Sequence, residues 1–213
     1  MQKVDLVLRH YNKLKPINCK IISGDTKNLF TVEVIDNDSK GLEAIKGDPV
    51  LIGMLNEDDS LFVAGGSIIG VNHQNDTYIL CKNELEFISK DLDKRNYERY
   101  PTSLTGEIKS QDENKREFIY LKDFSYLGMG AYSTGEFEIE DNVDISIYLS
   151  SNVAIFDGTI VRKRLNFGRN EYGIQILHRD KNSMFATQTQ LTTIVQNEKN
   201  LIHRQLLNAK CDI

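Results

Sequence analysis

Two short groups of residues in the chain combine residue types that could together hold a small anionic ligand. Arg95 and Arg99 lie four residues apart, and Asp123, Ser125 and Gly128 follow in the sequence DFSYLG. A guanidinium group binds a phosphate through two parallel hydrogen bonds, and it can equally meet the O6/N7 edge of guanine. A carboxylate accepts hydrogen bonds, a serine hydroxyl can donate to phosphate, and glycine allows a close approach of the backbone to a ligand. Together the two groups predict a site for a small anionic ligand.

Each group also has a structural interpretation. Arg95 and Arg99 can be solvated charges of a linker, because short motifs often arise by chance. Asp123 and Ser125 can shape a turn by hydrogen bonding to nearby backbone, and Gly128 suits a structural role in either interpretation. Asp123 can also hold an arginine in place instead of contacting a ligand.

The arginines lie in a charged segment that separates two strand-rich regions. Residues 89–99 read SKDLDKRNYER, and Pro101 keeps the residue before it out of the helical region. We therefore predict an extended linker here, between a first domain at residues 1–92 and a second domain at residues 93–213.

The region before the linker carries short apolar stretches separated by turn residues. Residues 4–14 are an exception, because their apolar spacing favours a short helix that ends at Pro16. Gly47-Asp48-Pro49 and Gly65-Gly66 are predicted turns. Short strands with turns every ~8–12 residues are typical of a small barrel or sandwich. The predicted strands lie at residues 30–35, 50–52, 61–64, 67–71 and 78–82.

In the region after the linker, apolar and polar residues alternate. This pattern buries one face of each strand and leaves the other in water, as in a closed antiparallel barrel. A helix is expected from about Ala186 to about Ala209, packed on its own barrel. The predicted strands lie at residues 105–109, 117–122, 136–140, 143–149, 159–161 and 172–177.

Composition excludes several classes of protein. The 213 residues are 40% hydrophobic and 27% charged, which is too apolar for a disordered chain. No apolar run is long enough to cross a bilayer and no secretory signal is visible, so we expect no membrane insertion. The odd number of cysteines (Cys19, Cys81 and Cys211) fits free thiols in the cytoplasm. The net charge of −5 argues against a nucleic-acid coat, which needs a basic face.

Other chemistries lack their residue patterns. The glycine-rich residues 65–70 are not followed by Gly-Lys-Ser/Thr, so they do not form a phosphate-binding P-loop. The four histidines have no metal-ligand spacing, and no nucleophile elbow is present, so we predict no metal site and no enzyme activity.

The two groups of residues resemble the signature of a known family. Arg95 and Arg99 match the RxxxR motif of PilZ domains, and Asp123, Ser125 and Gly128 match the DxSxxG motif. The resemblance covers about residues 93–177. The first region is similar in layout to the N-terminal barrel of YcgR-like proteins. Supporting matches lie at Met129-Gly130, Gly158–Val161 and Tyr172-Gly173-Ile174, and in the first region at Gly47–Val50.

This resemblance implies a fold and a ligand. The expected fold is mainly β, with two small barrels, the second six-stranded, and a C-terminal helix. PilZ domains bind cyclic di-GMP, and no cofactor or catalysis is implied. Asp123 could accept hydrogen bonds from guanine N–H groups while the arginine arm closes over the ligand. The implied ligand-binding residues are Lys94, Arg95, Arg99, Asp123, Ser125 and Gly128.

The resemblance also implies partners and leaves alternatives. The expected mechanism is a switch in which the bound linker fixes one domain relative to the other, and the output acts on a flagellar motor or exopolysaccharide synthesis protein. Lys94 favours a stacked pair of nucleotides, whose four phosphate charges need more cation. The alternatives are a PilZ-like adaptor that works through protein contacts without nucleotide, and a single-stranded nucleic-acid binder. The complete motifs argue against the first and the acidic total against the second.

Overall fold

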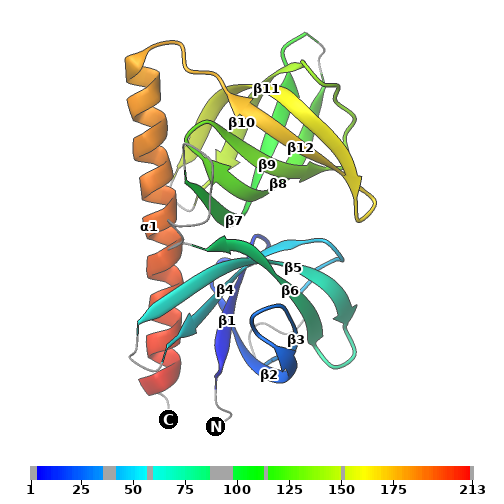
Figure 1. Ribbon diagram of the computed structural model, residues 1–213, viewed down its shortest axis with the longest axis vertical. Helices are drawn as coiled ribbons and strands as arrows, with labels where there is room; N and C mark the ends of the chain where they lie inside the picture. The colour runs from blue at the N-terminus through cyan, green and yellow to red at the C-terminus, as the bar shows by residue number, and fades with distance from the viewer. Residues whose placement is uncertain are drawn as a thin grey trace. The chain divides into compact units, whose positions relative to one another are not determined.

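The strands of the chain form two closed barrels, followed by a long helix (Figure 1). Each barrel has six antiparallel strands, so the predicted fold class, mainly β with two small barrels and a C-terminal helix, is confirmed. The computed structural model describes residues 4–35, 42–56, 60–86, 98–112, 115–149 and 152–211.

The first barrel closes in the order β1-β2-β3-β6-β5-β4, with β4 paired to β1. Buried side chains of these strands, among them Phe30, Ile52 and Tyr78, fill its interior. Gly47 lies in the predicted turn with φ of +92°, a backbone conformation that glycine adopts without strain. The strands are β1 (Leu6–His10), β2 (Ile17–Asp25), β3 (Leu29–Val34), β4 (Pro49–Leu55), β5 (Leu61–Asn72) and β6 (Thr77–Glu86).

The second barrel repeats this connectivity. In both barrels the first strand pairs with the second, and the second pairs with the third. The third strand pairs with the sixth, the sixth with the fifth and the fifth with the fourth. The fourth strand pairs with the first and closes the barrel. Its core contains Leu121, Phe124, Ile160 and Tyr172, which are all fully buried. The strands are β7 (Arg99–Ser110), β8 (Arg116–Ser125), β9 (Gly128–Ser133), β10 (Asn142–Tyr148), β11 (Val153–Asn166) and β12 (Arg169–Ile176).

The helix predicted at residues 4–14 is wrong, because Leu6–His10 form strand β1. All five residues of this strand are buried. The outward side of β1 is also covered, since Arg9 bonds to Glu198 of the C-terminal helix. A strand buried on both faces loses the alternation that identifies a strand, and its apolar residues then mimic helical spacing.

Two further local predictions are wrong. Gly65-Gly66 do not separate two strands, because β5 runs through them with a shift in register against β6 between Ala64 and Gly66. Residues 136–140 are not a strand either. They lead into a turn in which Glu140 has φ of +77° and the Asp141 carboxylate accepts a hydrogen bond from the Glu138 amide. Phe137 is buried there against Tyr172, which explains its apolar character.

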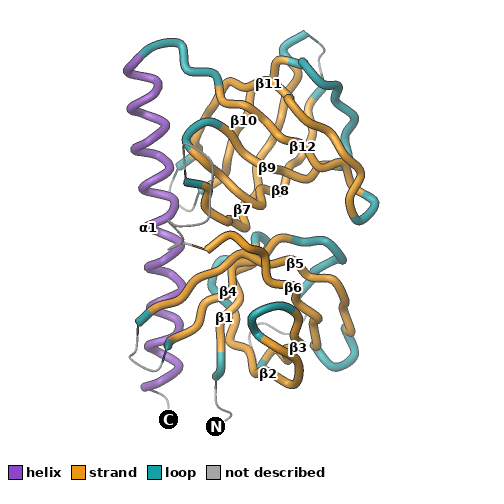
Figure 2. Tube along the Cα trace, viewed as in Figure 1, coloured by secondary structure: helices purple, strands orange, loops and turns teal. Residues whose placement is uncertain are grey.

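The C-terminal helix, α1, spans Lys181–Cys211 and therefore begins five residues before the predicted start (Figure 2). Its start is stabilised by a reciprocal cap. The Asp180 carboxylate accepts a hydrogen bond from the Ser183 amide, and the Asp180 amide donates one to the Ser183 hydroxyl. No helix among the described residues is long and apolar enough to cross a membrane.

The chain divides into two compact units, and α1 contributes to both. Residues 1–89 and 197–213 form one unit, and residues 90–196 form the other. Leu191 and Ile194 belong to the core of the second barrel, whereas Ile202 lies in the first unit, where it covers Gly53. The predicted domains, 1–92 and 93–213, differ from these units in placing all of α1 with the second barrel, and their limits stay a prediction.

Most of the predicted linker at residues 89–99 lies outside the described residues. Its last residue, Arg99, is the first residue of β7, and Tyr100-Pro101 continue that strand.

Candidate functional site

The predicted site residues of the second barrel lie on its outer face, where β8, β9, β12 and β11 are adjacent. Asp123 pairs with Gly130 across β8 and β9, Gly130 pairs with Gly173 of β12, and Gly173 pairs with Arg162 of β11. Alternate residues of these strands, such as Met129 and Ile174, lie in the core, so this row faces outward. The row therefore has charged residues at its two ends and two glycines between them.

The next row on the same face contains the other motif residues. Arg99 of β7 pairs with Ser125 of β8, and Ser125 pairs with Gly128 of β9. The antiparallel pairing of β7 with β8 thus brings the last residue of the predicted linker beside the DxSxxG residues. Sequence spacing alone could not predict this contact, because it depends on the register of β7 against β8.

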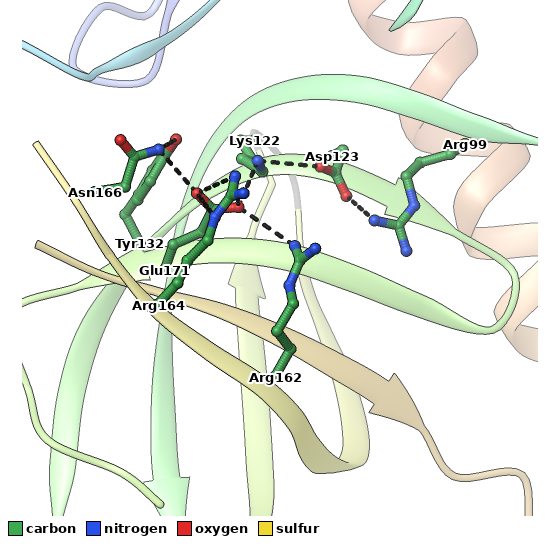
Figure 3. Close-up of polar contacts among 8 residues, drawn as sticks. All are labelled: Arg99, Lys122, Asp123, Tyr132, Arg162, Arg164, Asn166 and Glu171. Carbon is green, nitrogen blue, oxygen red and sulfur yellow. Dashed lines mark hydrogen bonds and ion pairs between the residues drawn. The ribbon is translucent and has the colours of Figure 1, made fainter. Parts of the chain in front are cut away.

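Asp123 forms an ion pair with Arg99 (Figure 3). Their Oδ1 and Nη1 atoms lie 2.9 Å apart, and Asp123 is only 3% exposed. This ion pair lacks hydrogen-bond geometry, so among the described residues Asp123 Oδ1 and the buried Arg99 Nε make no hydrogen bond. A buried polar atom without a hydrogen bond costs about 1–3 kcal/mol. The pair therefore has one acceptor and one donor that a ligand could satisfy.

Ser125 and Gly128 flank the two-residue turn between β8 and β9. The Ser125 hydroxyl donates a hydrogen bond of 2.9 Å to the Gly128 carbonyl, and both residues are buried. A Cβ atom on Gly128 would lie 2.5 Å from the carbonyl oxygen of Ile174, so any side chain there collides with β12. These contacts support the structural interpretation of the two residues and leave their contact with a ligand a prediction.

Lys122 connects Asp123 to a second carboxylate, Glu171. Its Nζ lies 2.7 Å from Glu171 Oε1 and 3.9 Å from Asp123 Oδ2. The pairing of β8 with β9 shifts register between Leu121 and Asp123, as at a β-bulge. Because of this shift, two consecutive residues of β8 direct their charged ends to the same face.

Glu171 is a fully buried carboxylate that holds several donors together (Figure 3). Arg164 donates from Nε and Nη2 at 2.9 and 2.8 Å, and Asn166 donates from Nδ2 at 2.9 Å. Arg162 Nη2 lies 3.4 Å away. Burial alone would raise the pKa of Glu171, but the hydrogen bonds from Lys122, Asn166 and Arg164 lower it to about 2. Glu171 is therefore ionised at neutral pH.

A tyrosine closes one side of this cluster. Tyr132 pairs with Glu171 across β9 and β12, and its hydroxyl accepts a hydrogen bond of 3.3 Å from Asn166. Burial and the Glu171 carboxylate raise the pKa of Tyr132 to about 12, so the hydroxyl stays protonated. Arg169 stacks over the Tyr132 ring at 4.9 Å.

The structure brings together four of the six predicted ligand residues: Arg99, Asp123, Ser125 and Gly128. Lys94 and Arg95 lie outside the described residues.

Sequence reasoning missed Lys122, Arg162, Arg164 and Glu171. Alternation in the sequence VRKRLN was a usable signal, because Arg162 and Arg164 share a face if the segment is a strand. Glu171 gave no such signal, since a lone acidic residue is usually solvated.

A cavity of about 400 Å³ lies beside this site, between the start of β7, the β8–β9 turn and α1. Its lining includes one carboxylate, from Glu98, and no cation among the described residues. An anionic ligand would find no opposite charge there, so the cavity is a poorer candidate than the charged face. Its eight lining residues are Glu98, Tyr100, Tyr126, Gln188, Leu191, Thr192, Val195 and Gln196.

Comparison with known families assigns the second barrel. The second unit is a small β domain, a closed barrel with a row of charged and glycine residues on its outer face. The PilZ domain family matches residues 93–196, and this part of the chain is a PilZ domain, as its motifs predicted. No match was found among curated proteins.

Solved structures with similar folds include the following three proteins. YcgR of Escherichia coli in complex with c-di-GMP is 13% identical, with 92% of this chain and 86% of that chain covered and a TM-score of 0.44. The Bacillus subtilis inhibitor of motility (MotI/DgrA) is 15% identical, with 94% and 99% covered and a TM-score of 0.40. The K. pneumonia MrkH–c-di-GMP complex is 10% identical, with 93% and 90% covered and a TM-score of 0.44.

Proposed function

We propose that the chain is a receptor for cyclic di-GMP and that Arg99 and Asp123 contact the nucleotide. The observation that carries the proposal is the ion pair between the buried Asp123 and the partly exposed Arg99 within a PilZ domain, with hydrogen-bonding capacity left on both. The ligand offers the complementary groups. Guanine N1–H and N2–H₂ can donate to Asp123 Oδ1, and a phosphate oxygen or the guanine O6/N7 edge can accept from Arg99.

The remaining motif residues have proposed roles on the same ligand. Lys94 and Arg95 precede β7 in the chain, and their cationic side chains would bind the phosphates together with Arg99. Gly128 would let the backbone of the β8–β9 turn approach the ligand, and Ser125 would keep that turn in shape through its bond to Gly128. A bound nucleotide would then hold the segment before β7 against the barrel, which changes the arrangement of the two units. We expect no catalysis.

The proposed output follows from the family resemblance. It is an effect on flagellar rotation or on exopolysaccharide synthesis, through a protein partner that senses the arrangement of the two units. Small-angle X-ray scattering with and without nucleotide tests the rearrangement, and an unchanged scattering curve on saturation would contradict it.

Calorimetric titration of the full chain with cyclic di-GMP tests the binding proposal, with GTP and cyclic di-AMP as controls. We expect saturable binding to cyclic di-GMP alone. Arg99→Ala removes charge-assisted hydrogen bonds worth about 1.5–3 kcal/mol, which corresponds to an affinity about 10- to 150-fold lower.

Arg116→Ala is the matched control for this variant. Arg116 lies in the same β7–β8 hairpin as Arg99 and also forms an ion pair with a carboxylate, that of Glu107. Its side chain is 67% exposed, on the solvent side of the hairpin. Its loss should leave the affinity unchanged. Equal affinities of the Arg99→Ala, Arg116→Ala and unmodified proteins would overturn the role of Arg99. Absence of binding by the unmodified protein would instead support an adaptor that acts through protein contacts.

A further inference from the structure

The glycine row of the second barrel has no side chain at its centre. Gly130 and Gly173 pair across β9 and β12, and they separate Asp123 from Arg162. A Cβ atom on Gly130 would lie 2.8 Å from both carboxylate oxygens of Asp123, and one on Gly173 would lie 3.2 Å from Cβ of Arg162. The charged residues at the ends of the row therefore depend on the two glycines for their space. The centre of the row is therefore a floor of backbone atoms without side chains.

Three cations surround this floor. Arg162 and Arg164 come from β11, where a register shift between Ile160 and Arg162 precedes them, and Lys122 comes from the irregular part of β8. All three contact Glu171, which fixes their positions (Figure 3). The cluster thus consists of three positive charges and one buried negative charge.

The cations have more binding capacity than Glu171 uses. Arg164 donates to Glu171 from Nε and Nη2, and Arg162 makes a single long contact from Nη2. A guanidinium group has five N–H donors, so both arginines retain donors for another acceptor. Their side chains are 51% and 53% exposed, so a dissolved ligand can reach them. The cluster carries an excess of two positive charges on a chain whose net charge is −5.

We propose that Lys122, Arg162 and Arg164 form a second phosphate subsite over the floor of Gly130 and Gly173. The proposal rests on the proposed function, since cyclic di-GMP has two phosphates, and Arg99 lies at the Asp123 end of the row whereas Arg162 lies at its opposite end. Lys122 links the two subsites, because its Nζ contacts Glu171 and lies 3.9 Å from Asp123. A guanine held by Asp123 would place the adjoining sugar–phosphate over the glycine floor.

The test is titration of the Arg162→Ala protein with cyclic di-GMP, compared with Lys163→Ala. Lys163 lies between the two arginines and carries the same charge, but its Nζ bonds to Glu136 and Glu138 and not to Glu171. Both variants change the net charge equally, so a difference between them reports a local contact. Because Arg162 is half exposed, we expect its loss to lower the affinity by about 5- to 15-fold, with no loss for Lys163→Ala. Arg162→Glu should lower the affinity further.

The outcomes separate this inference from the proposed function. If the unmodified protein binds, Arg99→Ala binds weakly and Arg162→Ala binds like Lys163→Ala, the second subsite is wrong and the receptor function stands. If the unmodified protein does not bind cyclic di-GMP, both proposals fall. Thermal melting followed by circular dichroism checks folding. Arg162→Ala should melt at the temperature of the control, because Arg162 is half exposed and makes a single long contact.

Discussion

Replacement of the buried Glu171 by glutamine tests the electrostatics of the candidate site. The glutamate is fully buried and accepts hydrogen bonds from Lys122, Arg164 and Asn166. These donors lower its pKa from 4.5 to about 2 against the opposing effect of burial. This difference in pKa corresponds to about 3 kcal/mol of folding free energy at pH 7. The value is an upper limit, because the side chains of Arg162 and Arg164, which contact Glu171, are half exposed. Glu171→Gln should therefore lower the free energy of unfolding by up to about 3 kcal/mol.

The pH dependence gives the sign of the effect. A carboxyl group whose pKa is lower in the folded state stabilises the fold above its unfolded-state pKa, and this stabilisation is lost as the pH falls through the folded-state pKa. For Glu171 the loss extends from about pH 4.5 to about pH 2. About 2 kcal/mol should remain at pH 3.5. The difference in stability between the unmodified protein and Glu171→Gln should thus decrease as the pH falls.

Urea denaturation followed by circular dichroism at pH 7 and pH 3.5 measures this difference. The matched control is Glu138→Gln, which also removes a carboxylate bonded to a lysine, but one whose side chain is 76% exposed. The control should change stability little at either pH. A Glu171→Gln protein as stable as the unmodified protein at pH 7, or a difference that does not depend on pH, would refute the reasoning.

Three other substitutions probe close contacts. Gly130→Ala places a Cβ atom 2.8 Å from the Asp123 carboxylate and should displace this carboxylate from Arg99. We expect at least about 10-fold weaker binding of cyclic di-GMP in a titration, with the fold retained. Ser125→Ala removes the buried hydrogen bond to Gly128 and should cost about 1 kcal/mol of unfolding free energy, whereas an unchanged urea midpoint would contradict this role. Gly53→Ala puts a Cβ atom 2.1 Å from Cγ2 of Ile202. The substitution should destabilise the first unit by about 1–3 kcal/mol. Hydrogen exchange in the C-terminal turns of α1 should increase as a result. Unchanged exchange there would contradict the packing.

The local patterns of the second barrel were sufficient to predict its class. Alternation at residues 143–149 predicted strand β10 because one face of that strand is buried and the other lies in water. The DxSxxG and RxxxR motifs identified a PilZ domain because their residue types and spacing are local properties of the chain. Asp180 and Ser183 have the residue types and spacing of a helix N-terminal cap, so the start of α1 was also predictable from the sequence. The sequence-based prediction placed that start too late, at Ala186.

Tertiary structure decided what the local patterns could not. Strand β1 resembled a helix in the sequence because it is covered on both sides, and that covering depends on α1, almost 190 positions later in the chain. The cluster around Glu171 depends on the register of β12 against β9 and β11, and on the shifts that turn Lys122 and Arg162 to the outer face. The sequence by itself determined the fold class and the motif residues, since these follow from local periodicity and composition. Only the closed barrel decided which charges meet, because a shift of one residue in register would move each side chain to the opposite face.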